Sequence, residues 1–181
     1  MMKKMFKIGF LSLLASTMFF TNTSCTSDDD GGGGGTAAAG TITAKVNGST
    51  VTTLNMVTFA NQVGSMLSIQ GNTGGTSSKA FVLNITSFDG VGTYDIGGGT
   101  GGLGLANASY TEISVNLSNP MASTTKVWQA PYTGGAKVGE IKISEATATG
   151  VKGTFQFSCK NSDDNSTKEV TQGSFNVNFQ N

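Results

Sequence analysis

The sequence has no histidine, and it has no arginine because all 11 of its basic residues are lysines. Histidine is the usual general base near neutral pH and the commonest metal ligand, and arginine holds phosphate through paired hydrogen bonds. Catalytic or metal sites built on histidine and phosphate sites built on arginine are therefore excluded. The chain also has only two prolines and two cysteines, against 26 glycines, a composition typical of a turn-rich β protein.

Charge is scarce as well, since charged residues make up 12% of the chain and the formal net charge is zero. Three of the 11 lysines, and no acidic residue, lie in residues 1–24. Without that segment the chain keeps 8 lysines and 11 acidic residues, a net charge of about −3. Binding of nucleic acid requires clustered basic side chains, so no nucleic-acid partner is expected.

Residues 1–24 have the layout of an export signal. A basic segment ends at Lys7, and the 13 residues from Ile8 to Phe20 are uncharged, too few for a membrane-spanning helix. Ser24-Cys25 then resembles the lipobox of bacterial lipoproteins, although Asn22 stands where that motif favours leucine. The resemblance implies cleavage before Cys25 and lipid on its thiol, which would anchor the chain to a membrane. The alternative is an ordinary secretory signal.

Residues 25–40 have the composition of a tether. Ser27 to Asp30 (SDDD) resembles the acidic signal that sends Bacteroidetes-type lipoproteins to the outer face of the outer membrane. Five glycines and the segment TAAAG follow, and they contain too little apolar surface to fold. We therefore expect a lipid-anchored domain that faces the cell exterior, with the periplasmic face, or an acidic tether without a sorting role, as the alternatives.

Residues 41–181 are predicted to form one all-β domain of about nine to ten strands. Apolar residues alternate with polar ones at the period of a half-buried strand. The clearest sets are Ile42/Ala44/Val46, Phe81/Leu83/Ile85, Ile113/Val115/Leu117, Phe155/Phe157/Cys159 and Phe175/Val177/Phe179, and the weaker ones are Leu67/Ile69, Tyr94/Ile96, Trp128/Ala130/Tyr132 and Ile141/Ile143. Short connections, such as the hairpin signal Asn47-Gly48, favour an antiparallel β-sandwich or a barrel-like up-and-down meander.

The last two predicted strands share the form G-[ST]-F-x-[FV], beginning at Gly153 and Gly173. With the opening G-x-I-x-A-K-V-N-G from Gly40 and the central G-x-Y from Gly92, this ending resembles a family of small uncharacterised Bacteroidetes-type surface lipoproteins. The resemblance implies an all-β domain of unknown role. Large apolar residues of this hairpin, Phe157 among them, are expected in the core.

Candidate ligand-binding residues are the amphipathic aromatics Trp128, Tyr132 and Tyr110, whose rings would suit a glycan if they were exposed, although core packing is favoured for Trp128. Asp163, Asp164 and Asn165 could offer oxygens to Ca²⁺, but they lack the spacing of an EF-hand and are better explained as a solvated turn. Cys159 is expected to be buried and free of any disulfide. No cofactor or resident metal is expected.

Two further sequence patterns bear on whether the protein is an enzyme. Gly99 to Gly104 matches G-x-G-x-x-G, but no helix or suitably placed acid follows, which indicates a surface loop. A glycosidase needs two acids across a cleft, and no spacing singles out such a pair. The sequence therefore predicts a non-enzymatic binding or interaction domain for a glycan or an envelope protein, with a structural envelope component as the alternative and a glycan-active hydrolase as the least favoured reading. The acids weighed for the hydrolase are Asp89, Asp95, Glu112, Glu140 and Glu145.

Overall fold

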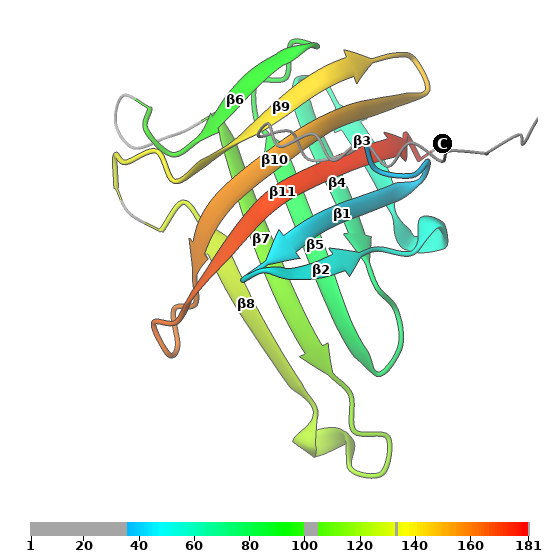
Figure 1. Ribbon diagram of the computed structural model, residues 1–181, viewed down its shortest axis with the longest axis vertical. Helices are drawn as coiled ribbons and strands as arrows, with labels where there is room; N and C mark the ends of the chain where they lie inside the picture. The colour runs from blue at the N-terminus through cyan, green and yellow to red at the C-terminus, as the bar shows by residue number, and fades with distance from the viewer. Residues whose placement is uncertain (1–35, 100–104, 133, 181) are drawn as a thin grey trace, which may run out of the picture. The chain divides into compact units, whose positions relative to one another are not determined.

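The computed structural model describes residues 36–99, 105–132 and 134–180, and within them the chain is almost entirely β (Figure 1). The strands are β1 (Thr41–Val46), β2 (Ser49–Thr52), β3 (Phe59–Val63), β4 (Met66–Asn72), β5 (Ser77–Ile85), β6 (Gly92–Ile96), β7 (Ala106–Ser114), β8 (Thr124–Ala130), β9 (Gly139–Ala146), β10 (Gly150–Lys160) and β11 (Thr167–Asn178). Two short 3₁₀ helices, η1 (Asn55–Val57) and η2 (Pro120–Ala122), lie in connections. The prediction of an all-β fold is confirmed.

The 11 strands of the described residues form one continuous sheet that folds into two facing layers. The front layer contains β6, β9, β10, β11, β1 and β2, and the back layer contains β3, β4, β5, β7 and β8. In Figure 1 the front strands run across the back strands at an angle. The layers join at one edge through the pairs Ile96↔Ala106 and Lys160↔Gln129, and at the other through the bridge Ala60↔Phe179.

The structure thus combines the two architectures that the sequence left open. Its layers pack face to face as in a sandwich, and they are joined at both edges as in a barrel. The strand order is not that of a simple meander, because β5 pairs with β7 and β6 pairs with β9. Nearly all pairs are antiparallel, as the short connections predicted.

The G-[ST]-F repeat of β10 and β11 lets the two strands pack their phenylalanine rings against each other's glycines. Gly153 lies opposite Phe175, and Gly173 lies opposite Phe155. A Cβ atom on Gly153 would approach the Phe175 ring to 2.5 Å, and one on Gly173 would approach the Phe155 ring to 2.7 Å. Each glycine therefore leaves the space that the opposing ring fills, and the two rings stack with their centroids 6.3 Å apart.

A bulge in β11 bends this hairpin. Between the pairs Phe155↔Gly173 and Phe157↔Val170, β11 contains one more residue than β10, and Gln172 adopts a φ of 51°. The register of β11 with β1 shifts in the same region. Because bulges increase the local twist of a strand, this residue helps the front layer to curve over the back layer.

The hairpin signal at Asn47-Gly48 is confirmed. Val46 pairs with Ser49, so the turn has two residues, and Asn47 and Gly48 have φ values of 46° and 84°. Positive φ at both positions is the requirement of a type I′ turn.

One predicted strand face is wrong. Ile113, Val115 and Leu117 were expected to face the core, but β7 buries Ala106, Ala108 and Tyr110, while Val115 and Leu117 are exposed beyond its end. The small alanines gave a weak apolar signal, whereas the larger residues near the tip gave a strong one. The strands β2 and β3 were not predicted from the sequence. Each buries a single apolar residue, Val51 in β2 and Ala60 in β3, so neither shows a clear apolar alternation.

Phe157→Ala is expected to lower the free energy of unfolding by about 3–5 kcal/mol, because it leaves a cavity in a packed core. Phe157 is 2% exposed and its ring stacks on that of Phe155. Chemical denaturation measures the loss. Met121→Ala is the control, since Met121 is fully exposed at the β7–β8 tip, and an equal loss in both variants would contradict the packing argument.

Candidate functional site

The inner face of the back layer changes from apolar to polar along β5, β7 and β8. Residues directly opposite one another on these strands form rows that share one face. The first row is wholly buried and ends the core, the second is charged, and the third carries hydroxyls. These rows are Phe81, Tyr110 and Trp128; Lys79, Glu112 and Lys126; and Ser77, Ser114 and Thr124.

Glu112 lies where the core ends, and two donors hold its carboxylate. The Tyr110 hydroxyl and the Lys168 ammonium, which comes from β11 in the front layer, each donate to Oε1 over 2.9 Å. Burial favours the neutral acid, but these hydrogen bonds and the charges of Lys168 and Lys79 outweigh it and hold the pKa of Glu112 below its usual value. The carboxylate is therefore ionised at neutral pH.

Tyr110 is fixed as a donor in this network. Burial, and then the hydrogen bond to Glu112, raise the pKa of its hydroxyl well above the ordinary value. The phenol thus stays protonated at any physiological pH. Its ring is fully buried and packs against Phe81 on one side and Trp128 on the other.

Lys168 also contacts the two rings of the core row. Its ammonium lies 4.5 Å from the centroid of the Trp128 ring and 5.7 Å from that of Tyr110, within the range of cation–π attraction. The Trp128 indole donates to the Ser166 hydroxyl over 2.9 Å. The aromatic row and Glu112 together hold the lysine that connects the two layers.

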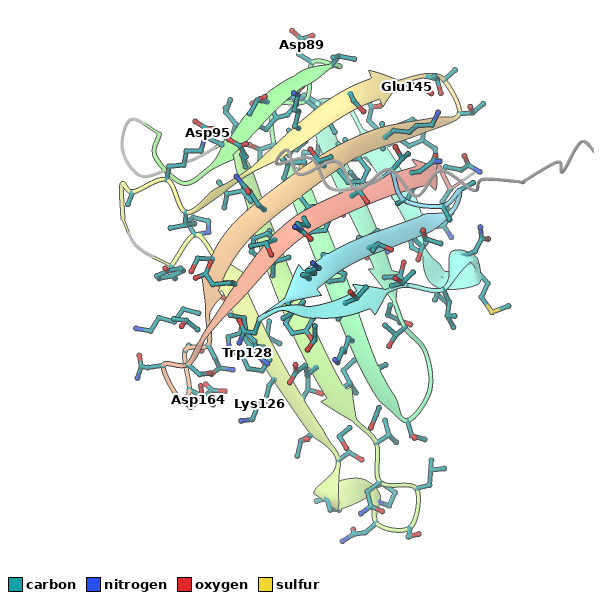
Figure 2. The ribbon with its side chains drawn as sticks, viewed as in Figure 1. Asp89, Asp95, Lys126, Trp128, Glu145 and Asp164 are labelled. Carbon is teal, nitrogen blue, oxygen red and sulfur yellow. The ribbon has the colours of Figure 1, made fainter. Side chains whose placement is uncertain are left out.

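Beyond Glu112 the inner face is hollowed into a pocket of about 420 Å³, here named the blade pocket. Its volume falls in the range of small-molecule sites. The pocket is lined by Ser77, Ser78, Lys79, Glu112, Ile113, Ser114, Thr124 and Lys126. Lys126 also pairs with Asp164 of the β10–β11 turn over 3.2 Å, and Figure 2 shows both side chains beside Trp128 at this end of the domain.

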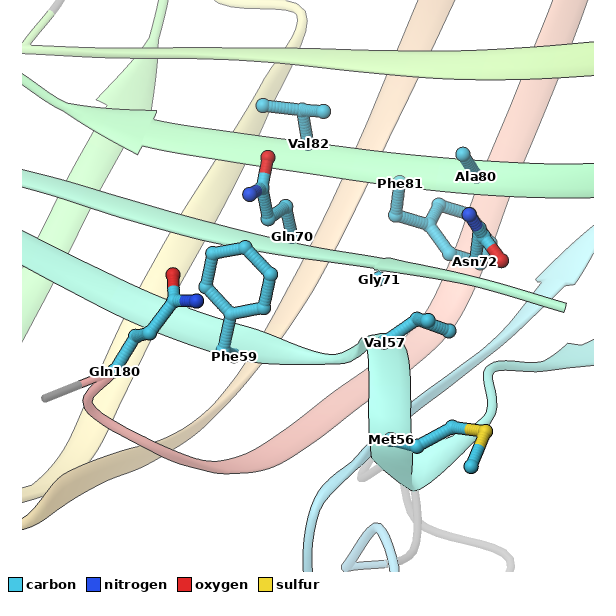
Figure 3. A pocket seen from close by; sticks show the side chains of 10 residues that line it. All are labelled: Met56, Val57, Phe59, Gln70, Gly71, Asn72, Ala80, Phe81, Val82 and Gln180. Carbon is cyan, nitrogen blue, oxygen red and sulfur yellow. The ribbon is translucent and has the colours of Figure 1, made fainter. Parts of the chain in front are cut away.

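Two other hollows have no charged residue in their linings. One, of about 390 Å³, lies on the outer side of the back layer, where the Phe59 ring stands beside the amides of Gln70 and Gln180, with Val57 and Met56 of η1 to one side (Figure 3). The other, of about 320 Å³, is lined mainly by polar residues near the β3–β4 turn, such as Asn61 and Gln62. Of these three hollows, only the blade pocket combines charge, hydroxyls and shifted pKa values, which makes it the candidate site.

The three aromatic candidates from the sequence lie in different environments. Trp128 and Tyr110 are buried at 3% and 0% exposure, so they present no free ring face for stacking on a sugar. Trp128 packs in the core, as the sequence favoured. Tyr132 is 39% exposed, and its hydroxyl lies 3.2 Å from that of Ser158.

The acidic turn Asp163, Asp164 and Asn165 connects β10 to β11. The Ser166 hydroxyl and backbone, followed by Lys126, hold the pKa of Asp164 at about 2, so this carboxylate is ionised and occupied by its own neighbours. In the part of the chain that the structure describes, no three acidic or cysteine side chains gather as a metal site would require.

The remaining acids lie outside the blade pocket. Asp95 and Glu140 are opposite each other on β6 and β9, and Lys137 pairs with both, at 2.8 and 2.7 Å. Asp89, Asp95 and Glu145 lie apart from one another and far from Trp128 in Figure 2. None of the three hollows is lined by any of these acids.

Cys159 is fully buried, as expected from its phase with Phe157. Burial, and then the charge of Glu169, raise the pKa of its thiol to about 12, so the reactive thiolate is not formed at neutral pH. Cys25 and most of the Gly99 to Gly104 segment lie outside the described residues. No helix in the described ranges has the length and apolarity needed to cross a membrane.

Sequence reasoning did not find Lys79 or Lys168, and it considered Glu112 only as one acid among several. The signal available was the continuation of the β5 and β7 alternation past Phe81 and Tyr110, where the inward positions become charged. Lys168 had no local signal, because its partner Glu112 is 56 residues away.

A family model described as "Domain of unknown function (DUF6252)" matches residues 38–177, which is most of the chain and nearly the whole β domain. The chain belongs to this family. Every residue of the blade pocket and its supporting network lies inside the matched region. No curated protein and no solved structure matched the chain.

Glu112→Gln is expected to destabilise the protein at neutral pH by at most about 1 kcal/mol, because the ion pair with Lys168 is only partly buried. The folded-state pKa of Glu112 lies below the ordinary value of 4.5. The stabilisation is therefore complete above that value and is lost as the pH falls through the lowered folded pKa.

Denaturant unfolding of the wild type and the variant at a series of pH values measures this difference. The two curves should converge in acid. Glu145→Gln is the matched control, since Glu145 forms an exposed pair with Lys152. A difference between wild type and Glu112→Gln that persists unchanged in acid would contradict the ionic role of Glu112.

Proposed function

We propose that this chain is a lipid-anchored lipoprotein of the bacterial outer membrane whose β domain binds a small ligand in the blade pocket without catalysing a reaction. The observation that carries the binding role is the blade pocket itself. Charged side chains from three adjacent strands converge there on a hollow of about 420 Å³ that the front layer does not fill.

The chemistry of the pocket favours binding over catalysis. Glu112 is ionised and already accepts two hydrogen bonds, and Tyr110 has a raised pKa, so neither is poised to exchange a proton near neutral pH. The buried thiol of Cys159 is not a nucleophile under these conditions. Fixed charges and hydroxyls suit recognition of a polar ligand.

The anchoring role is supported by the sequence before the β domain. A basic segment, an apolar run and Cys25 stand in the order of a lipoprotein signal, and Asp28 to Asp30 and the glycine spacer follow. Two or more acyl chains on one cysteine give lasting membrane attachment, whereas one is marginal. The tether would hold the β domain away from the membrane, with the cell exterior as the favoured side.

Cys25→Ser is expected to abolish lipid modification and release the protein from the membrane fraction. Mass spectrometry of the mature wild-type N-terminus should show an acylated Cys25, and protease treatment of intact cells should digest the domain if it faces outward. Cys159→Ala is the matched control and should keep the anchor. An unmodified N-terminus at another position would contradict the lipoprotein assignment.

Ligands of the blade pocket can be found through Trp128, the only tryptophan of the chain. Its indole lies under Lys168 in the row next to Glu112, so occupancy of the pocket should change its fluorescence. We expect at least one hit from a panel of neutral, acidic and basic saccharides and amino acids, measured on the full chain in neutral detergent.

Ser114→Leu should abolish the response to that hit, because Ser114 lines the pocket. Ser109→Leu is the matched control, since Ser109 lies on the same strand but faces the outer side with Val82 and Gln129. A panel without any hit, or a hit that both variants bind equally, would overturn the proposed site.

A further inference from the structure

We infer that the ligand of the blade pocket is a small hydroxyl-bearing anion, a molecule that carries a carboxylate or phosphate group beside several hydroxyl groups. This inference rests on the proposed function and specifies the chemistry of the same site. It follows from the charges, the free oxygen of Glu112 and the row of hydroxyls.

The lysines of the pocket outweigh its carboxylate. Lys168 already offsets the charge of Glu112 through its 2.9 Å ion pair. Lys79 and Lys126 then remain on the two sides of Glu112, and each lies directly opposite it in the sheet. No residue in the described ranges forms an ion pair with Lys79, and the partner of Lys126, Asp164, lies outside the pocket lining. The hollow therefore has excess positive charge.

This positive charge is local. The chain as a whole has a formal net charge of zero, and the linings of the other two hollows are uncharged. A positively charged pocket bounded by the apolar core row attracts anions, because low-dielectric walls strengthen its field. An anionic group beside Lys79 would supply the charge that the protein does not.

Glu112 adds a requirement for a hydrogen-bond donor on the ligand. Both of its protein donors bind Oε1, and within the described part of the chain no donor reaches Oε2. A ligand hydroxyl can donate to this oxygen, whereas a second carboxylate there would be repelled. Ser77, Ser114 and Thr124 form the next row, and their hydroxyls both donate and accept. The pattern suits one anionic group with hydroxyls around it.

The probes are D-glucuronate, D-glucose 6-phosphate and D-glucose, titrated against the full chain in neutral detergent with Trp128 fluorescence and calorimetry. We expect the two anions to bind and glucose to bind at least about tenfold more weakly. Binding of the anions should weaken as salt is added, because screening reduces attraction between charges. The stronger anion distinguishes a carboxylate ligand from a phosphate ligand.

Lys79→Gln should weaken anion binding by about tenfold or more, since it removes the lysine that has no partner within the described ranges. Lys142→Gln is the matched control, because Lys142 is exposed on β9 and lines none of the three hollows. Thermal melting of both variants separates loss of binding from loss of fold.

Each of the following results would overturn the inference. If glucose binds as tightly as the anions, or if Lys79→Gln and Lys142→Gln behave alike, the pocket does not select anions, while the proposed binding function stands. If none of the three probes binds but a neutral or basic panel compound binds in a manner abolished by Ser114→Leu, the anion assignment fails alone. Absence of any hit in the whole panel overturns the proposed function as well.

Discussion

The ion pair between Lys168 and Glu112 is the contact on which the candidate site depends. It connects β11 of the front layer to β7 of the back layer at the level where the apolar core stops. Tyr110 and Trp128 form the last row of that core, and both rings contact the same ammonium. The pair therefore ends the packed region on one side, and its Glu112 lines a polar hollow on the other.

The position of this boundary follows from the different lengths of the two layers. The back strands β5, β7 and β8 continue past the row of Tyr110, and in Figure 1 the β7–β8 hairpin projects beyond the front layer. Inner-face residues that a facing layer covers must be apolar, and those beyond it are in contact with water. Along the inner face of β7 the residues therefore change from buried Tyr110 to charged Glu112 and then to Ser114, as the front layer no longer covers the strand.

The sequence predicted the parts of the fold that depend on neighbouring residues. The Asn47-Gly48 turn and the strands β5, β10 and β11 were predicted correctly, because turn residues and the alternation of apolar and polar residues are local patterns. The prediction from sequence failed where the apolar pattern did not match the buried positions. In β7 the inner face begins with small alanines, whereas the larger Val115 and Leu117 lie exposed beyond the end of the strand. Closure of the layers depends on pairs such as Ala60↔Phe179, which no local pattern encodes.

The candidate site was hidden for a related reason. A charged residue in strand phase, such as Lys79, has the same sequence pattern whether it faces open water or a pocket, and only the register with Glu112 and Lys126 separates the two cases. The aromatic residues that first suggested a binding surface do take part, but indirectly. Buried Trp128 and Tyr110 hold Lys168 in place, Lys168 neutralises Glu112, and the charge of Lys79 is thereby left available to a ligand.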